Sequence, residues 1–106
     1  GVLPNKMAAD CDPHDLMWNR RMIIDTIRGG PDGDMVRPQY DNVFCGHTPT
    51  ILLKVYTSTD PVHMSNVWML DTGAGYDGKL SVMDYETKEV WQSDPVPELY
   101  PGMRAR

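Results

Sequence analysis

The eight residues from Val43 to Thr50 constrain the fold of this chain more than any other stretch. Val43-Phe44-Cys45 is an apolar run that predicts the end of a buried strand, and Gly46 then allows a sharp backbone turn. Thr48-Pro49 keeps the next residues out of a helix. His47 is therefore expected on a tight turn, where a rigidly held imidazole can act as a metal ligand. An ordinary strand-loop junction with a polar histidine is the alternative.

The overall totals limit the class of protein. The length of 106 residues suffices for one small domain, and a chain that is 41% hydrophobic and 24% charged is typical of globular proteins. A net charge of −5 argues against nucleic acid or an anionic membrane as the main partner. With no membrane-spanning apolar run and no signal segment, a cytoplasmic location is predicted. Cys11 and Cys45 form no C-x-x-C pattern, so reduced thiols are the simplest reading, with one disulfide left open.

One helix is predicted over residues 13–28. Asp12 can cap it, and the proline that follows suits the first helical position. Apolar residues recur at helical spacing until Gly29-Gly30-Pro31 ends the helix. Arg20 lies on this helix and could hold an anion, because a guanidinium binds phosphate in a bidentate way; a solvated helix arginine is the alternative. His14 is explained by the helix cap.

The rest of the chain predicts mainly strands. The expected elements are, in chain order, a short strand or extended segment over 51–56, a polar loop over 57–65 that carries His63 at the surface, a buried strand over 67–70, and an antiparallel hairpin over 79–93. The buried strand delivers Asp71-Thr72-Gly73-Ala74-Gly75 at its end. The proline-rich tail, residues 94–106, is expected to form neither a helix nor a central strand.

Three segments in this order carry a family resemblance: Val-Phe-Cys-Gly-His-Thr-Pro-Thr at 43–50, Asn-Val-Trp-Met-Leu-Asp-Thr-Gly-Ala-Gly at 66–75, and Gly-Lys-Leu-Ser-Val-Met-Asp at 78–84. Together they resemble the C-terminal part of the phosphoprotein phosphatase branch of the calcineurin-like metallophosphoesterases. The resemblance covers about residues 1–93 and is strongest over 43–93. Trp18-Asn19-Arg20 is similar to the Trp-x-Arg helix of that family.

The resemblance implies a fold and a chemistry. The fold would be α/β with α+β character, a partial metallophosphoesterase sandwich with one N-terminal helix and mostly antiparallel strands. His47 would bind one metal of a dinuclear site that holds two divalent ions of Mn, Fe or Zn. Arg20 would contact the substrate phosphate, in a phosphorylated protein or a small phosphomonoester. Asp71 to Gly75 would form a structural loop rather than a ligand loop.

The departures from the family pattern are large. The Asp-x-His-Gly, Gly-Asp-x-x-Asp-Arg and Gly-Asn-His-Glu/Asp motifs are absent, and the family's isolated metal-binding histidine would fall immediately before Gly1. Residues 1–106 therefore resemble a single partial domain, the C-terminal portion of a serine/threonine-type protein phosphatase or related hydrolase, inactive alone. Half a sandwich leaves an apolar sheet edge and face uncovered, so pairing with a complementary N-terminal half or self-association is expected.

A rival interpretation rests on Asp71-Thr72-Gly73, which also resembles the active-site motif of retroviral-type aspartic proteases. Those enzymes are homodimers in which two such carboxylates share a proton to activate water. The position of the motif argues against this reading, because few residues follow it and the last of them are broken by prolines. A non-catalytic binding domain is the third alternative.

Overall fold

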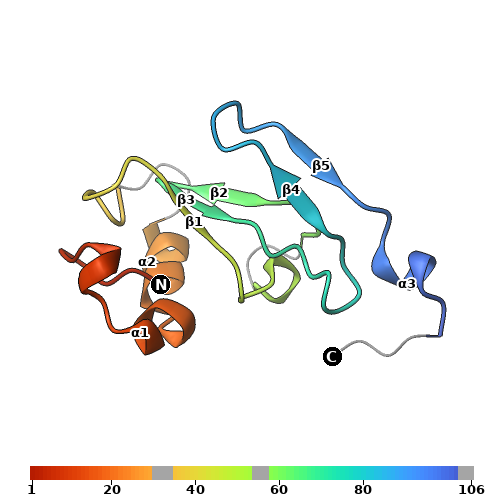
Figure 1. Ribbon diagram of the computed structural model, residues 1–106, viewed down its shortest axis with the longest axis horizontal. Coiled ribbons are helices and arrows are strands. Elements are labelled where there is room, and N and C mark those ends of the chain that lie inside the picture. Colours follow the sequence, from red (N-terminus) through yellow and green to blue (C-terminus); the bar gives the residue numbers. More distant parts are fainter. Residues whose placement is uncertain (30–34, 54–57, 103–106) are drawn as a thin grey trace. The chain divides into compact units, whose positions relative to one another are not determined.

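The computed structural model describes residues 1–29, 35–53 and 58–102, in which helices and strands are mixed in an α+β arrangement (Figure 1). The chain divides into two compact units. The first comprises residues 1–47 and 63–68, and the second comprises residues 48–62 and 69–106. Within the described ranges, no helix combines the length and the apolar character needed to cross a membrane.

The first unit carries a small sheet and the N-terminal helices. Its elements are η1 (Ala8–Asp10), α1 (Pro13–Trp18), α2 (Arg21–Gly29), β1 (Val43–Cys45) and most of β2 (Val62–Met64) and β3 (Val67–Met69). The three strands pair in the order β1-β3-β2. The two residues that join β2 to β3 make that pair an antiparallel hairpin. By contrast, Val43 N donates to Asn66 O (2.8 Å) and the Cys45 thiol to Trp68 O (3.5 Å), so β1 and β3 run in the same direction.

The prediction of one helix over residues 13–28 is wrong at its centre. The structure has two helices, α1 and α2, separated by a corner at Asn19 and Arg20. Asn19 ends α1 in an extended conformation with ψ of 117°, and its Oδ1 accepts from Arg21 N at 2.9 Å. An asparagine side chain that bonds to nearby backbone competes with the helix in this way. The predicted start is confirmed, because Asp12 Oδ1 accepts from His14 N at 2.8 Å.

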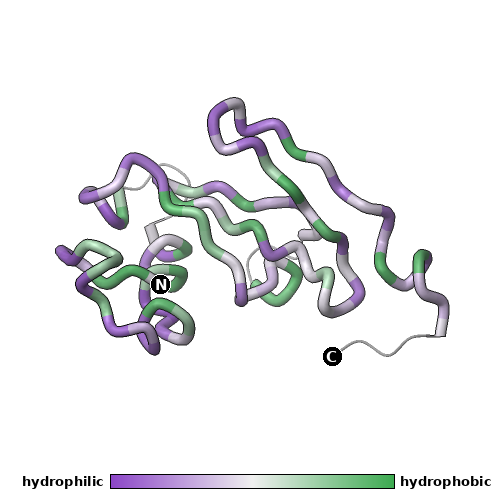
Figure 2. The backbone as a smooth tube through the Cα atoms, in the orientation of Figure 1, coloured by the Kyte–Doolittle hydropathy of each residue, from purple (hydrophilic) through white to green (hydrophobic). Residues whose placement is uncertain are grey.

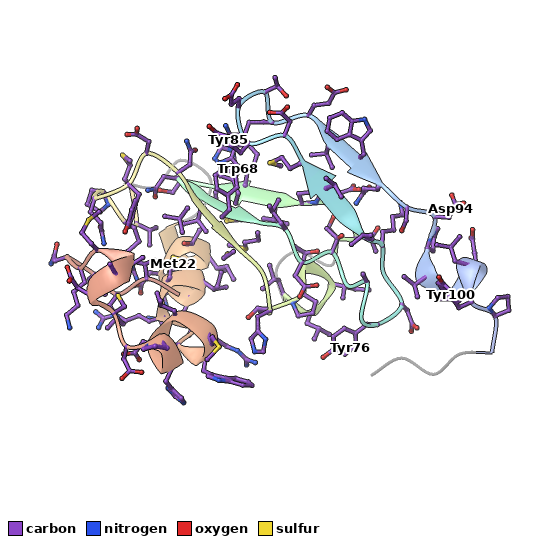
Figure 3. All side chains as sticks on the ribbon, in the orientation of Figure 1. Met22, Trp68, Tyr76, Tyr85, Asp94 and Tyr100 are labelled. Atoms are coloured by element: carbon purple, nitrogen blue, oxygen red, sulfur yellow. The ribbon has the colours of Figure 1, made fainter. Side chains whose placement is uncertain are left out.

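The core of the first unit lies where α2 and the strands contribute apolar side chains. Met22, which Figure 3 labels on α2, is only 1% exposed and is the largest apolar side chain of this core. The other buried apolar residues of this unit are Val2, Cys11, Ile23, Val43, Met64 and Val67. Thr26, also fully buried, satisfies its hydroxyl by donating to Met22 O one turn earlier at 2.7 Å.

Two buried polar residues hold the segment that leads into β1. The guanidinium of Arg37 is 2% exposed; it donates to Val2 O and Val36 O and lies 3.8 Å from Asp25 Oδ2. Burial lowers the pKa of Arg37, and the Asp25 carboxylate opposes that shift. Asn66 donates from its amide nitrogen to Arg37 O and to Tyr40 O, each at 2.9 Å. The turn between β2 and β3 therefore anchors residues 37–40.

The strand predictions are partly confirmed. β1 and β3 occur where they are expected, whereas β2 lies inside the predicted polar loop over 57–65. Val62 and Met64 are buried and His63 between them is exposed, an alternation too short to stand out from its polar surroundings. Part of the predicted strand over 51–56 lies outside the described residues, and Thr50–Leu52 forms the 3₁₀ helix η2 instead.

The second unit contains the predicted hairpin. Strands β4 (Ser81–Met83) and β5 (Val90–Gln92) pair antiparallel, with Val82 opposite Trp91. Figure 2 shows hydrophobic residues on both strands and a more hydrophilic turn between them, and Figure 3 places Tyr85 at that turn. The backbone N–H groups of Thr87 and Glu86 lower the pKa of Asp84 by donating to its carboxylate.

The tail prediction is wrong in one detail. Val96–Leu99 forms α3, a single helical turn, although a helix was excluded after Asp94 because of the prolines. Proline is tolerated in the first turn of a helix, where its missing N–H would have no intrahelical partner. Val96 N also donates to Gly78 O at 2.8 Å, which ties this turn to the loop before β4.

Candidate functional site

The turn after β1 presents His47 to solvent. His47 itself takes the left-handed conformation of this turn, with φ of 70°. Gly46 is the residue expected to make the sharp turn, but the left-handed residue is the histidine that follows it. Non-glycine residues adopt positive φ uncommonly, and such backbone strain concentrates at functional sites. The side chain of His47 is exposed, so its imidazole is available to a ligand from outside the unit.

The indole of Trp18 contacts the His47 ring. The two ring centroids lie 4.7 Å apart, and the ring planes meet at 83°, the edge-to-face geometry that aromatic pairs prefer. Trp18 is the last residue of α1 and is 56% exposed. The structure thus brings the end of α1 against the turn after β1, two places that lie far apart in the sequence.

Arg20 lies at the corner between α1 and α2, two residues after Trp18, and its side chain is exposed. The corner is held by Asn19, whose backbone N donates to Asp15 O at 3.1 Å and whose Oδ1 accepts from Arg21 N. A guanidinium on a fixed corner can bind an anion in a bidentate way. Arg21, the next residue, instead lies 3.7 Å from Asp25 Oδ2 on the surface of α2.

The exposed imidazole of His47 is of a kind that can serve as a single metal ligand. In residues 1–29, 35–53 and 58–102, no three His, Cys, Asp or Glu side chains gather into a metal site. These residues would therefore need further ligands from elsewhere to hold the two ions that the resemblance implies. Cys45 is a poor additional ligand, since burial raises the pKa of its thiol to about 11 and keeps it neutral.

The Asp71-Thr72-Gly73 motif forms a closed loop in the second unit. Asp71 Oδ1 accepts from Gly73 N at 3.1 Å, and Gly73 has φ of 86°. Thr72 is 1% exposed; its Oγ1 donates to Lys79 O and lies 2.6 Å from Ser81 Oγ. The motif bonds mainly to itself and to the start of β4. Catalysis by Asp71 in a protease-like dimer stays a prediction from the motif alone.

Gly78 closes this loop because it lets its own backbone lie directly against that of Thr72 and Gly73. A Cβ atom at position 78 would lie 2.0 Å from Thr72 O and 2.9 Å from the Gly73 Cα. Gly78 N donates to Gly73 O at 2.9 Å, and Lys79 N donates to Thr72 O at 3.1 Å. No side chain larger than hydrogen fits there without a shift of the backbone.

The other two histidines have structural neighbours. His14 lies in the first turn of α1 with its backbone N bonded to the Asp12 cap. His63 on β2 stacks on Trp68, which Figure 3 labels among the strands of the sheet, with centroids 3.5 Å apart and planes at 7°. Phe44 on β1 stacks on the same indole at 6.2 Å. Both free cysteines, Cys11 and Cys45, belong to the first unit.

Asn19 is the residue of this site that the sequence reasoning missed. The predicted helix over residues 13–28 places Asn19 in its interior, but Asn19 ends one helix and accepts from the first backbone N–H of the next. The available signal was its chemistry, because asparagine favours caps and corners over helix interiors. Comparison with protein-family models, curated proteins and solved structures gave no match to this chain.

Proposed function

We propose that this chain is the C-terminal portion of a metal-dependent phosphomonoester hydrolase of the serine/threonine protein phosphatase type. His47 contributes one metal ligand and Arg20 binds the phosphate of a phosphorylated protein or a small phosphomonoester. The remaining ligands of the two divalent ions, Mn, Fe or Zn, come from a complementary N-terminal portion. The metal ions supply an activated water for attack on phosphorus.

The observation that carries this proposal is the contact between the Trp18 and His47 rings. The motif resemblance assigns the Trp-Asn-Arg segment and the Gly-His turn to one active site, and this contact brings the two segments together. Arg20 follows Trp18 on a corner that Asn19 holds from both sides. The corner fixes the backbone from which the exposed Arg20 side chain extends, and a guanidinium can bind two phosphate oxygens at once.

A second observation supports a missing partner. Leu80, Val82 and Trp91 lie on one face of the β4–β5 hairpin and are 58%, 57% and 52% exposed. A two-stranded hairpin is marginally stable by itself, and a neighbouring layer normally covers its apolar face. We propose that a complementary portion or a second copy of the chain covers this face.

The test is reconstitution with the complementary half of a metallophosphatase, one that carries the Asp-x-His-Gly, Gly-Asp-x-x-Asp-Arg and Gly-Asn-His motifs. The 106-residue chain alone should hydrolyse p-nitrophenyl phosphate with added Mn²⁺ at a rate near background. In the reconstituted enzyme, His47→Ala should lose metal and nearly all turnover. Arg20→Ala should keep its metal, because a guanidinium is not a ligand, and should bind phosphate poorly.

The chain offers matched controls. Arg21→Ala removes a neighbouring, exposed arginine whose partner is the half-buried carboxylate of Asp25 one turn along α2. Asp25 keeps its contact with Arg37, so activity should stay close to that of the unmodified enzyme. His14→Ala and His63→Ala should also have little effect. Tolerance of His47→Ala together with loss of activity in His14→Ala or Asp71→Ala would contradict the assignment.

A further inference from the structure

We infer that Trp18 is a positioning residue for His47: the edge-to-face contact of its indole sets the direction in which the imidazole offers its nitrogen to a metal ion. The inference rests on the ligand role proposed for His47. It adds a residue whose side chain needs to touch neither the metal nor the substrate. The distance of 4.7 Å and the angle of 83° between the rings are the starting observations.

An exposed imidazole on a turn needs a partner to hold it. A ligand histidine usually obtains its orientation from a hydrogen bond between its second ring nitrogen and a carboxylate or carbonyl oxygen. For His47, the ring contact with Trp18 is the interaction found among the residues that the structure describes. The contact can restrict rotation about both side-chain torsions of the histidine, because edge-to-face pairs favour a narrow range of geometries.

The indole can serve as a reference because its own backbone is fixed. Trp18 ends α1, and Asn19 directly after it donates from its backbone N to Asp15 O at 3.1 Å. The Asn19 side chain holds both helices, with Nδ2 donating to Asp15 Oδ1 at 3.3 Å and Oδ1 accepting from Arg21 N at 2.9 Å. The backbone of Trp18 is thus fixed by the same corner that carries Arg20. Asn19 therefore links the proposed metal ligand, His47, to the proposed phosphate-binding residue, Arg20.

A purely structural role explains Trp18 less well. At 56% exposure, the indole buries less than half of its surface, so it contributes little to the apolar core. The contrast with Trp68 is direct, because Trp68 is half-buried, stacks face to face with His63 and donates from Nε1 to Asn42 Oδ1 at 3.0 Å. Removal of Trp18 should therefore leave the fold intact and change mainly the His47 ring.

The experiment uses the 106-residue chain with isotope-labelled histidines, and Ni²⁺ as the probe metal. NMR would record the three imidazole spectra and their line broadening during a Ni²⁺ titration. In Trp18→Leu, the His47 ring signals should lose their ring-current shift and their cross-peaks to the indole. The Ni²⁺ affinity at His47 should fall about tenfold, the scale expected for loss of a group that orients a ligand.

The controls separate orientation from general disturbance. Trp18→Phe retains an aromatic ring and should restore most of the affinity, and it keeps the inference testable if the leucine variant does not fold. Met17→Leu changes the exposed residue next to Trp18 in the sequence. Trp91→Leu removes a similarly exposed tryptophan from the second unit. Neither should alter the His47 signals, and His14 and His63 serve as internal references in every spectrum.

Unchanged His47 signals and unchanged Ni²⁺ affinity in both Trp18 variants would overturn the inference. Equal changes at all three histidines would also overturn it, because they would indicate a structural role. The outcome is independent of the proposed activity, since no phosphatase assay is needed. In the reconstituted enzyme, excess Mn²⁺ should rescue Trp18→Leu and should not rescue Arg20→Ala. An inactive reconstituted enzyme with the Ni²⁺ effect intact would reject the function and leave the positioning role standing.

Discussion

Ser65 after β2 and Lys88 after β4 are left-handed, as are residues in the turns after β1 and β3, but the last two turns place that residue in opposite surroundings. After β1, His47 has φ of 70° and an exposed side chain. After β3, the left-handed residue is Gly73, with φ of 86°, in a buried position. A glycine adopts this conformation without steric cost, whereas a histidine does so against its preference.

The two turns also differ in the partners of their polar side chains. In the loop from Asp71 to Gly78, the side chains of Asp71 and Thr72 bond to the loop itself and to β4. The described contact of the His47 imidazole is a ring contact with Trp18, and the histidine is exposed to solvent. The described side-chain bonds of the Asp-Thr-Gly motif therefore lie within the loop and at the start of β4. Of the two left-handed residues compared, the exposed one is His47, after β1.

The largest expected effect tests the closed loop. Gly78→Ala should destabilise the second unit by about 3 kcal/mol, because the new Cβ would overlap Thr72 O and neither backbone segment can move freely. Urea unfolding followed by circular dichroism measures the loss. Gly29→Ala is the matched control, since a Cβ there meets nothing within 4 Å and should change stability little. Similar midpoints for the two variants would show that the loop tolerates expansion.

Thr72→Val sharpens the comparison by removing only the buried hydroxyl. The valine has almost the same shape, so the loss of the bonds to Lys79 O and Ser81 Oγ should cost about 1–3 kcal/mol. Thr87→Val in the exposed turn of the hairpin should cost less, because water can replace the bonds of its exposed hydroxyl to Glu89 N and the Asp84 carboxylate. Equal costs measured by urea unfolding would remove the distinction between a closed structural loop and an ordinary turn.

Asn19→Ala tests whether the corner between α1 and α2 is needed for the contact between Trp18 and His47. Loss of the cap on Arg21 N should cost about 1 kcal/mol, and the better helix former should join α1 to α2. Far-ultraviolet circular dichroism should then show more helix, and the NMR cross-peaks between Trp18 and His47 should disappear. Asn19→Ser keeps an acceptor oxygen without placing a second carboxylate beside Asp15, and it should retain both the corner and the cross-peaks. Persistence of the cross-peaks in the alanine variant would show that the corner is not needed.

The smallest effect concerns the strain at His47. His47→Gly should be more stable than His47→Ala by about 1 kcal/mol, because only glycine adopts positive φ without penalty. The same pair of substitutions at Met17, inside α1, should give the opposite order by a similar amount. Thermal unfolding of the four variants measures both differences. An alanine at position 47 as stable as glycine would mean that the turn relaxes and that His47 is not strained.

Local sequence chemistry predicted the features that depend on near neighbours. The alternation around Val82 and Val90 predicted the hairpin, and Asp12 predicted the helix start that the structure confirms. The break between α1 and α2 was missed because the apolar spacing continues on both sides of Asn19. Periodicity gives no information on a side chain that bonds to the backbone. β2 was missed because Val62-His63-Met64 provides only one alternation.

The candidate site was predictable only in part. Gly46 pointed correctly to a turn after β1, but the identity of the left-handed residue depends on how the chain leaves the strand. The Trp18 contact joins two segments that are distant in sequence, and no local pattern encodes such a pairing. The metal and phosphate roles of His47 and Arg20 derive from the motif resemblance, and they stay predictions until the reconstitution is done.

The placement of the three tryptophans has a practical consequence for optical work on this protein. Trp18 lies against the His47 turn, Trp68 is hydrogen-bonded in the sheet, and Trp91 is exposed on the hairpin. Each indole therefore reports fluorescence from a different part of the chain. Variants that retain a single tryptophan would follow the turn, the sheet and the hairpin separately, without any attached dye.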